Sequence, residues 1–101
     1  MGNPVSRVEG NVEADLKAIS AAFGKAVKLR RTEIDLSQEA LADAAGLARS
    51  FVSGIERGEA KASIGSVWKL ARALDCQPSA LWREAERIYA LKKAKLAPST
   101  E

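Results

Sequence analysis

Four small or hydrogen-bonding residues share one face of a short helix that the sequence predicts near the middle of the chain: Arg49, Ser50, Ser53 and Gly54. Val52 and Ile55 recur at helical spacing on the opposite face, where we expect them to anchor the helix in a core. Guanidinium and hydroxyl groups can form hydrogen bonds, and small neighbours keep the exposed face thin. A thin polar helix face of this kind fits the major groove of DNA.

Residues for other kinds of chemistry are scarce. The chain has no histidine and a single cysteine, Cys76, so the usual ligand sets of zinc and haem sites are missing from the sequence. General base catalysis favours a histidine or a carboxylate in a pocket, and no glycine-rich phosphate loop is present. We therefore expect no catalytic residue, no metal site and no cofactor, and an enzyme is the least favoured class.

Length and composition also limit the class of protein. The chain has 101 residues, enough for one domain, and 47% of them are apolar and 29% charged, as in globular proteins. The net charge of +3 hints at an anionic partner. No apolar run is long enough to span a membrane, and no secretory signal is visible. A lone thiol suits a reducing compartment, so we expect a cytoplasmic protein without a membrane partner.

Two short helices joined by a tight turn, within residues 37–58, must position the polar face. Ser37 is the expected N-cap of the first, because its side-chain oxygen can accept a hydrogen bond from a free backbone N–H. Gly46 can take the left-handed conformation that reverses the chain. The small residues Ala42 and Ala45 let the second helix of the pair approach closely.

Further helices are predicted before and after residues 37–58. Apolar residues at three- and four-residue spacing predict a helix over about residues 12–31, in which Gly24 permits a close packing contact. Ser63 caps a further helix, and Pro78 opens the last one. The inward face expected for the helix after Ser63 comprises Ile64, Val67, Leu70, Ala71 and Leu74. No segment alternates with period two, so the sequence predicts an all-α fold of five helices.

We divide the chain into three parts on this pattern. Residues 1–14 carry glycine, asparagine and proline punctuation and are expected to form a flexible N-terminal arm. Residues 15–96 form the helical domain, and residues 97–101 form a tail.

The segment SQEALADAAGLARSFVSGIERG, residues 37–58, resembles the helix-turn-helix domains of the Cro/C1 type, also called the XRE family. The resemblance extends over residues 23–82, with FGKAVKLRR before the turn and SIGSVWKLARALDCQPSALW after it. The run RSFVSGIERG is similar to small controller proteins of restriction–modification genes. The resemblance implies a compact, five-helix, lambda-repressor-like DNA-binding domain, here with extended first and last helices.

The resemblance also implies roles for individual residues. The residues facing base edges would be Arg49, Ser50, Ser53 and Gly54. Arg49 would pair bidentately with O6 and N7 of guanine. Contacts to the DNA backbone would come from Ser37, Gln38, Arg57 and Lys61. Arg31 and Glu56 match a structural ion pair between the first and third helices. The alternative for each of these polar residues is a solvated side chain.

Three positions depart from the family pattern. Ala48 replaces the usual Ser or Thr cap of the third helix, and Ala62 replaces a common loop proline. Asp75 stands where a glycine often ends the fourth helix. These three changes bear on loop geometry rather than on the predicted reading face. Cys76 falls at a position that is an apolar core residue in the family, so we expect it to be buried.

The pattern predicts a sequence-specific transcriptional regulator that binds double-stranded DNA. One short helix reads too few base pairs for a genome, so we expect a homodimer on a near-palindromic operator. Surplus apolar residues of the last helix supply the expected dimer interface: Trp82, Ile88, Tyr89 and Leu91. The alternative is an antitoxin-type or other interaction module whose main partner is another protein.

Overall fold

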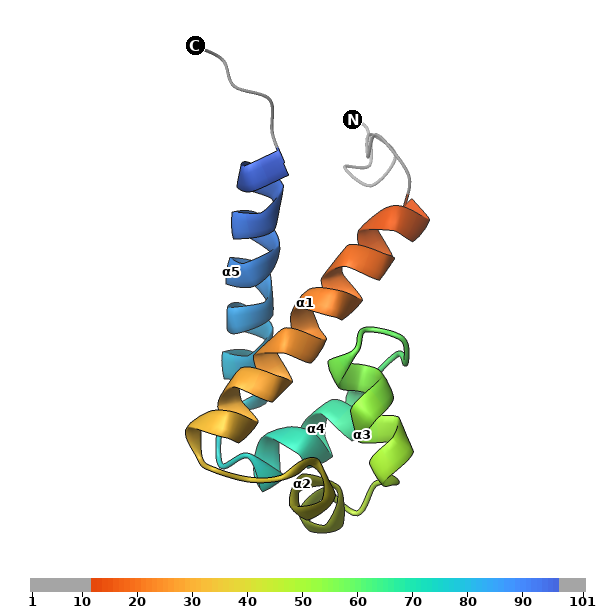
Figure 1. Cartoon of the computed structure of the whole chain (residues 1–101), viewed down its shortest axis with the longest axis vertical. Coiled ribbons are helices and arrows are strands. Elements are labelled where there is room, and N and C mark those ends of the chain that lie inside the picture. The colour runs from red at the N-terminus through yellow and green to blue at the C-terminus, as the bar shows by residue number, and fades with distance from the viewer. Residues whose placement is uncertain (1–11, 97–101) are drawn as a thin grey trace, which may run out of the picture.

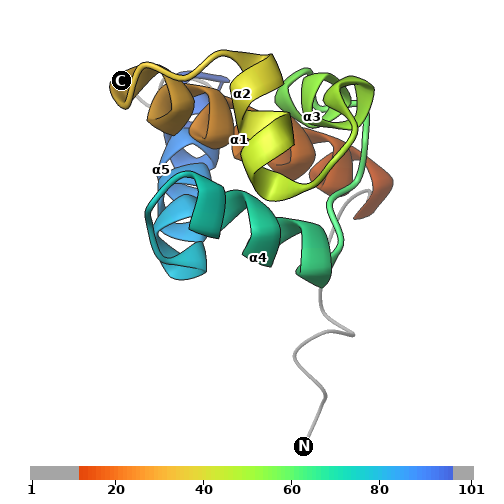
Figure 2. The same cartoon turned by 90° about the horizontal axis from the view of Figure 1, so that it is seen from below.

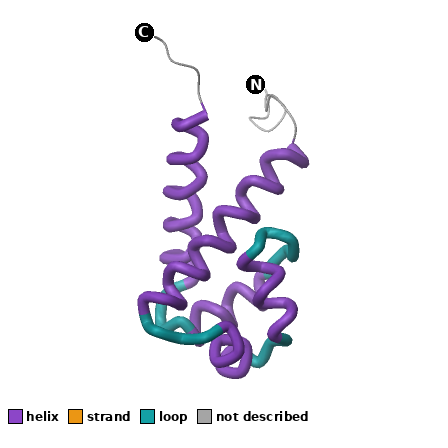
Figure 3. The backbone as a smooth tube through the Cα atoms, in the orientation of Figure 1, coloured by secondary structure: helices purple, strands orange, loops and turns teal. Residues whose placement is uncertain are grey.

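The computed structural model describes residues 12–96, and helices make up most of that range (Figure 1). The five helices are α1 (Val12–Glu33), α2 (Gln38–Ala45), α3 (Arg49–Glu56), α4 (Ile64–Ala73) and α5 (Pro78–Leu96). No strand occurs between residues 12 and 96 (Figure 3). The predicted all-α fold with long first and last helices is confirmed.

α1 and α5 are antiparallel neighbours whose far ends diverge, while α2, α3 and α4 gather around the other end of the pair (Figure 1). Figure 2 shows this cluster from below, with α4 lying beside α2 and α3. The rings of Phe23 and Trp82, with centroids 6.4 Å apart, join α1 to α5. The three shorter helices therefore pack against one end of the pair formed by the two long helices.

The core lies where the five helices meet. Its fully buried side chains include Leu41 from α2, Val52 and Ile55 from α3, Leu70 from α4, and Leu74 at the C-cap of α4. These are inward positions that the helical spacing predicts. Burial of one side of each short helix leaves its other side free for contacts with a partner.

The predicted inward face of α4 is wrong at its first residue, because Ile64 is 91% exposed. Ser63 and Ser66 form a capping box, each side chain bonding the backbone N–H of the other. The packed face of α4 therefore starts at Ser66 and leaves the preceding turn at the edge of the core. A shallow groove lined also by Trp68 and Trp82 lies beside Ile64.

Local caps set the limits of the two short helices. The Ser37 Oγ atom accepts a hydrogen bond from the Ala40 N–H at 2.9 Å, and Gly46 has a φ of 68°. Ala48 occupies the N-cap of α3 without a side-chain hydrogen bond. Asp75 adopts a φ of 54° after α4, a left-handed conformation that aspartate tolerates better than most residues.

α1 begins at Val12, where the apolar spacing starts, and it ends at Glu33, slightly beyond the predicted end. Residues 12–14, which the domain division assigned to the N-terminal arm, therefore belong to this helix. Glu13 and Asp15 lie in its first turn, where carboxylates interact favourably with the helix dipole. The rest of the predicted arm and the predicted tail lie outside the described residues.

Close backbone contact between α1 and α3 sets the position of α3. A Cβ atom at Gly24 would lie 2.1 Å from the carbonyl oxygen of Ile55 and 2.8 Å from that of Glu56. Only glycine fits at such a crossing. Gly24 of α1 therefore brings the two helices together, as its place in the apolar pattern indicated.

Candidate nucleic-acid interface

The solvent side of α3 carries three polar residues, which we call the α3 stripe: Arg49, Ser50 and Ser53. Arg49 and Ser50 are exposed, and Ser53 is half-buried. Val52 and Ile55 on the opposite side are buried in the core. The α3 stripe therefore lies on a helix whose opposite side is packed in the core.

The prediction that Gly54 shares this exposed face was wrong. Gly54 is buried, and a Cβ atom on it would lie 3.1 Å from the Cβ of Ala60. The backbone N–H groups of Glu59 and Ala60 both donate to the Gly54 carbonyl, at 2.8 and 3.1 Å. The loop after α3 thus folds back over Gly54, which makes room for the loop instead of facing solvent.

Arg31 and Glu56 meet between α1 and α3. Arg31 Nε donates to Glu56 Oε2 at 2.7 Å, and Arg31 Nη2 donates to Glu56 Oε1 at 3.0 Å. The side chains are only 12% and 3% exposed. The hydrogen bond to Glu56 raises the pKa of Arg31 above its ordinary value. Arg31 Nη1 also donates to the Leu36 carbonyl at 2.8 Å, so one guanidinium holds α1, the following loop and α3 together.

Gln38, at the first position of α2, joins the same cluster. Its Nε2 atom donates to Glu56 Oε1 at 2.9 Å, a contact that the sequence did not indicate. Glu56 thereby orients a side chain at the N-terminus of α2. Ser37, just before it, is exposed and caps the helix. Both residues predicted to contact the DNA backbone here are held in place by hydrogen bonds.

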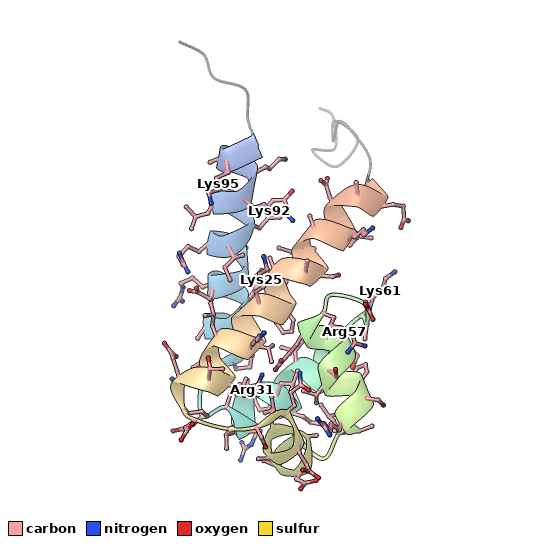
Figure 4. All side chains as sticks on the ribbon, in the orientation of Figure 1. Lys25, Arg31, Arg57, Lys61, Lys92 and Lys95 are labelled. Carbon is pink, nitrogen blue, oxygen red and sulfur yellow. The ribbon has the colours of Figure 1, made fainter. Side chains whose placement is uncertain are left out.

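Arg57 follows α3 directly and contacts two nearby residues. Its Nη1 atom donates to Ser53 Oγ, and its Nε atom donates to Glu59 Oε1 at 3.0 Å. Glu59 was not among the residues predicted for the site, although its opposite charge two positions after Arg57 was a signal. Lys61 is exposed in the same loop, and Figure 4 shows Arg57 and Lys61 along one edge of the molecule.

The residues predicted for a dimer interface lie along α5 in different environments. Trp82 is 49% exposed and Leu91 is exposed as well. Ile88 and Tyr89 are half-buried, because Ile88 packs against the core and the Tyr89 hydroxyl lies 3.4 Å from Asp15 Oδ1. Part of the predicted set therefore holds α5 to α1.

The described residues form neither a metal-binding cluster nor a membrane-spanning helix. No group of three or more His, Cys, Asp or Glu side chains between residues 12 and 96 is placed to hold a metal ion. No helix in the same range has the length and apolar character needed to cross a bilayer. Cys76 is half-buried, and burial raises the pKa of its thiol.

Comparison with known proteins places this geometry in a family. Residues 27–81 match the helix-turn-helix family, a span from α1 to the first turn of α5. Control protein C.BamHI of Bacillus amyloliquefaciens is 38% identical over 64 residues, which cover 62% of this chain and 79% of that protein.

Solved structures agree with the sequence match. The restriction-modification controller protein C.AhdI from Aeromonas hydrophila is 46% identical, with a TM-score of 0.61 over 67% of this chain and 97% of that one. The clp gene regulator ClgR from Corynebacterium glutamicum is 25% identical, with a TM-score of 0.74 over 76% of this chain and 82% of that one. The chain therefore belongs to the helix-turn-helix family, as an XRE-type DNA-binding regulator similar to the restriction–modification controller proteins.

Proposed function

We propose that this protein is a transcriptional regulator that recognises a near-palindromic DNA operator as a homodimer. The observation that carries the proposal is the α3 stripe on a rigid support. Arg49 and Ser50 are exposed and Ser53 is half-buried on a helix that Arg31 and Glu56 tie to α1. A polar helix held in this way can enter a major groove without losing much conformational entropy.

Each polar residue has a proposed role in the complex. Arg49 pairs with guanine, since its planar guanidinium matches the O6 and N7 acceptors of that base. Gln38 contacts a phosphate with its amide group, which Glu56 already orients. Ser37, Arg57 and Lys61 make the other backbone contacts, which set the register of the protein on DNA.

The homodimer interface that we propose lies beside the N-terminus of α4. Ile64, Trp68 and Trp82 are exposed at 91%, 57% and 49%, and all three line one groove. Three large apolar side chains at one place form a surface that water solvates poorly. For two α3 helices to enter successive major grooves, a two-fold axis through this surface must set them about 34 Å apart.

The proposed interface includes only some of the α5 residues that the sequence predicted for it. Trp82 belongs to the groove, whereas Leu91 lies further along α5. Leu91 therefore enters the interface only if the two copies of α5 also pair along their length. We also propose a cytoplasmic location, because the proposed partner is DNA.

Selection of DNA from a random duplex library tests the function directly. We expect the purified chain to enrich a near-palindrome, and sedimentation equilibrium to show a dimer alone or on that DNA. Binding should weaken steeply with added salt, because phosphate contacts release counterions. A chain that enriches no sequence, and stays monomeric on every duplex, would contradict the proposal.

A second candidate function is an interaction module whose main partner is another protein. One observation favours it: α1 starts before, and α5 ends after, the residues that match the family. These added turns expose Val12 and Leu16 on α1 and Leu91 on α5. Co-expression with the product of an adjacent gene, followed by gel filtration, would show a stable heteromeric complex if this function is the correct one.

A further inference from the structure

Ser53 lies on α3 at helical spacing from two arginines. Arg49 precedes it by one turn and Arg57 follows it by one turn, so the three side chains follow one line along the exposed side of the helix. Arg57 Nη1 donates a hydrogen bond to Ser53 Oγ. Contact between the two residues is therefore built into the spacing of α3.

Glu59 holds Arg57 in this position from the other side. Arg57 Nε donates to Glu59 Oε1 at 3.0 Å. The Glu59 backbone is fixed in turn, because its N–H donates to the Gly54 carbonyl at 2.8 Å. The planar guanidinium is thus bonded at two of its nitrogen atoms, in an ion pair whose side chains are 56% and 66% exposed.

This arrangement determines what the Ser53 hydroxyl can offer to a partner. A serine hydroxyl has one proton to donate and two lone pairs that accept. The Arg57 N–H takes one lone pair, and the positive charge of the guanidinium turns the hydroxyl proton away from it. Thr32 shows the alternative, because its hydroxyl lies 3.0 and 2.9 Å from the carbonyl oxygens of Lys28 and Leu29. Between residues 12 and 96, the Ser53 hydroxyl has no such acceptor.

We propose that Arg57 positions the Ser53 hydroxyl as a hydrogen-bond donor, so that α3 reads acceptor atoms at the base pair that Ser53 faces. In the major groove these acceptors are O6 of guanine, O4 of thymine and N7 of either purine, whereas cytosine presents an amino donor. Cytosine, which has no acceptor on its major-groove edge, is therefore disfavoured as the base that Ser53 contacts. Arg57 acts as a positioning residue here, in addition to any phosphate contact, and the inference rests on the proposed function.

The test measures how the full-length chain binds its selected operator and a set of duplexes in which each base pair is changed in turn. Ser53→Ala first identifies the base pair that Ser53 reads, as the pair at which preference is lost. We expect Arg57→Ala to relax preference about two- to tenfold at that same pair, the range for one hydrogen bond. Preference at the pair read by Arg49 should stay unchanged.

Arg57→Lys separates geometry from charge. Lysine keeps the positive charge that a phosphate contact needs, but it lacks the planar fork that joins Ser53 to Glu59. We expect this variant to keep the wild-type salt dependence and still lose preference at the Ser53 pair. Combining Ser53→Ala with Arg57→Lys should cause no further loss of preference, because both changes remove the same contact.

Glu59→Ala distinguishes positioning of Ser53 by Arg57 from a purely structural role of Arg57. Loss of a carboxylate near the DNA backbone should raise affinity for every duplex, while release of Arg57 lowers preference at the Ser53 pair. The inference is overturned if Arg57→Ala and Arg57→Lys leave that preference intact, or if they weaken binding to all duplexes equally. A wild-type chain without any operator preference would instead contradict the proposed function itself.

Discussion

The carboxylate of Glu56 accepts two hydrogen bonds from the guanidinium of Arg31, at 2.7 and 3.0 Å, and ties the end of α1 to the end of α3. Both side chains are largely shielded from water. A buried charge without its partner is costly, so the pair makes the position of α3 depend on α1. Because Gln38 also donates to Glu56, the N-terminus of α2 is held by the same carboxylate.

Arg31→Met should lower the free energy of unfolding by about 3–5 kcal/mol, because it leaves the Glu56 charge buried and unpaired. Urea titration followed by circular dichroism measures this loss. Arg87→Met is the matched control, since Arg87 pairs with Glu84 on the exposed surface of α5 and should leave the midpoint nearly unchanged.

The double variant Arg31→Met, Glu56→Met separates the loss of attraction from the cost of a stranded charge. It should recover part of the stability lost in Arg31→Met, because no unpaired charge remains. Equal unfolding midpoints for the single variant and the wild type would show that the ion pair does not support the fold.

Arg49→Ala should remove the preference for guanine at the base pair that Arg49 reads and spare weak binding to unrelated DNA. The expected loss of discrimination is about 1–3 kcal/mol, the range for one bidentate contact to guanine. Fluorescence anisotropy with operator and scrambled duplexes measures both affinities. Arg49 is exposed on α3, so the variant should keep the wild-type unfolding curve.

Gln38→Ala should act differently, because a phosphate contact positions the protein without reading sequence. We expect weaker binding to operator and scrambled duplexes by similar factors. Its contact with Glu56 also predicts a loss of about 1 kcal/mol in unfolding free energy. If both variants kept full operator affinity, the proposed reading face would be wrong.

Gly24→Ala should destabilise the fold by about 1–3 kcal/mol or more, because the new methyl group would meet the carbonyl oxygens of Ile55 and Glu56. Gly65→Ala is the matched control, because it makes the same substitution at a glycine without a close contact. A Cβ atom there would lie 3.8 Å from Ser63 Oγ, an ordinary contact. Alanine at this exposed helical position should stabilise the protein by about 0.5–1 kcal/mol. Thermal unfolding should show a lower midpoint for Gly24→Ala and a higher midpoint for Gly65→Ala than for the wild type.

The helices were predictable because their signals are local. Apolar spacing, the Ser37 cap and the left-handed Gly46 each act within a few residues. The pairing of Arg31 with Glu56 joins distant segments, and only the family resemblance indicated it. A local pattern also could not reveal that Ile64 lies beyond the edge of the core.

The site was predictable in its exposed arginine and serines but not in the loop that follows α3. Gly54 lies next to Ser53 in sequence, and helical spacing placed it near the exposed face. Its burial depends on how residues 59–62 fold back, which is set by the two N–H groups that bond its carbonyl. The same fold brings Glu59 to Arg57. Tertiary contacts of this kind leave no periodic signal.

Cys76 should react slowly with alkylating agents in the folded protein. Burial favours the neutral thiol and raises its pKa, so less thiolate is present at neutral pH than in an unfolded chain. Iodoacetamide labelling followed by mass spectrometry should be faster in urea. The labelling rate of the folded protein should rise only at a higher pH than that of the unfolded chain. Equal rates in both states at pH 7 would contradict this account.

The proposed dimer interface predicts that lysine at its centre keeps the protein monomeric. Ile64 and Trp68 are exposed in the single chain, so Ile64→Lys and Trp68→Lys should preserve the fold while their charges repel across a two-fold axis. Sedimentation equilibrium should show monomers for both variants, and their operator affinity should fall because one α3 helix makes only half of the contacts.

Leu91→Ser distinguishes this interface from one that extends along α5. Leu91 is exposed, and it lies outside the groove that Ile64 shares with Trp82. The variant should dimerise like the wild type if the groove alone forms the interface. Monomers of Leu91→Ser together with dimers of Ile64→Lys would move the interface to the C-terminal half of α5. In that arrangement the two α3 helices would take a different spacing, and the operator half-sites would have to follow it.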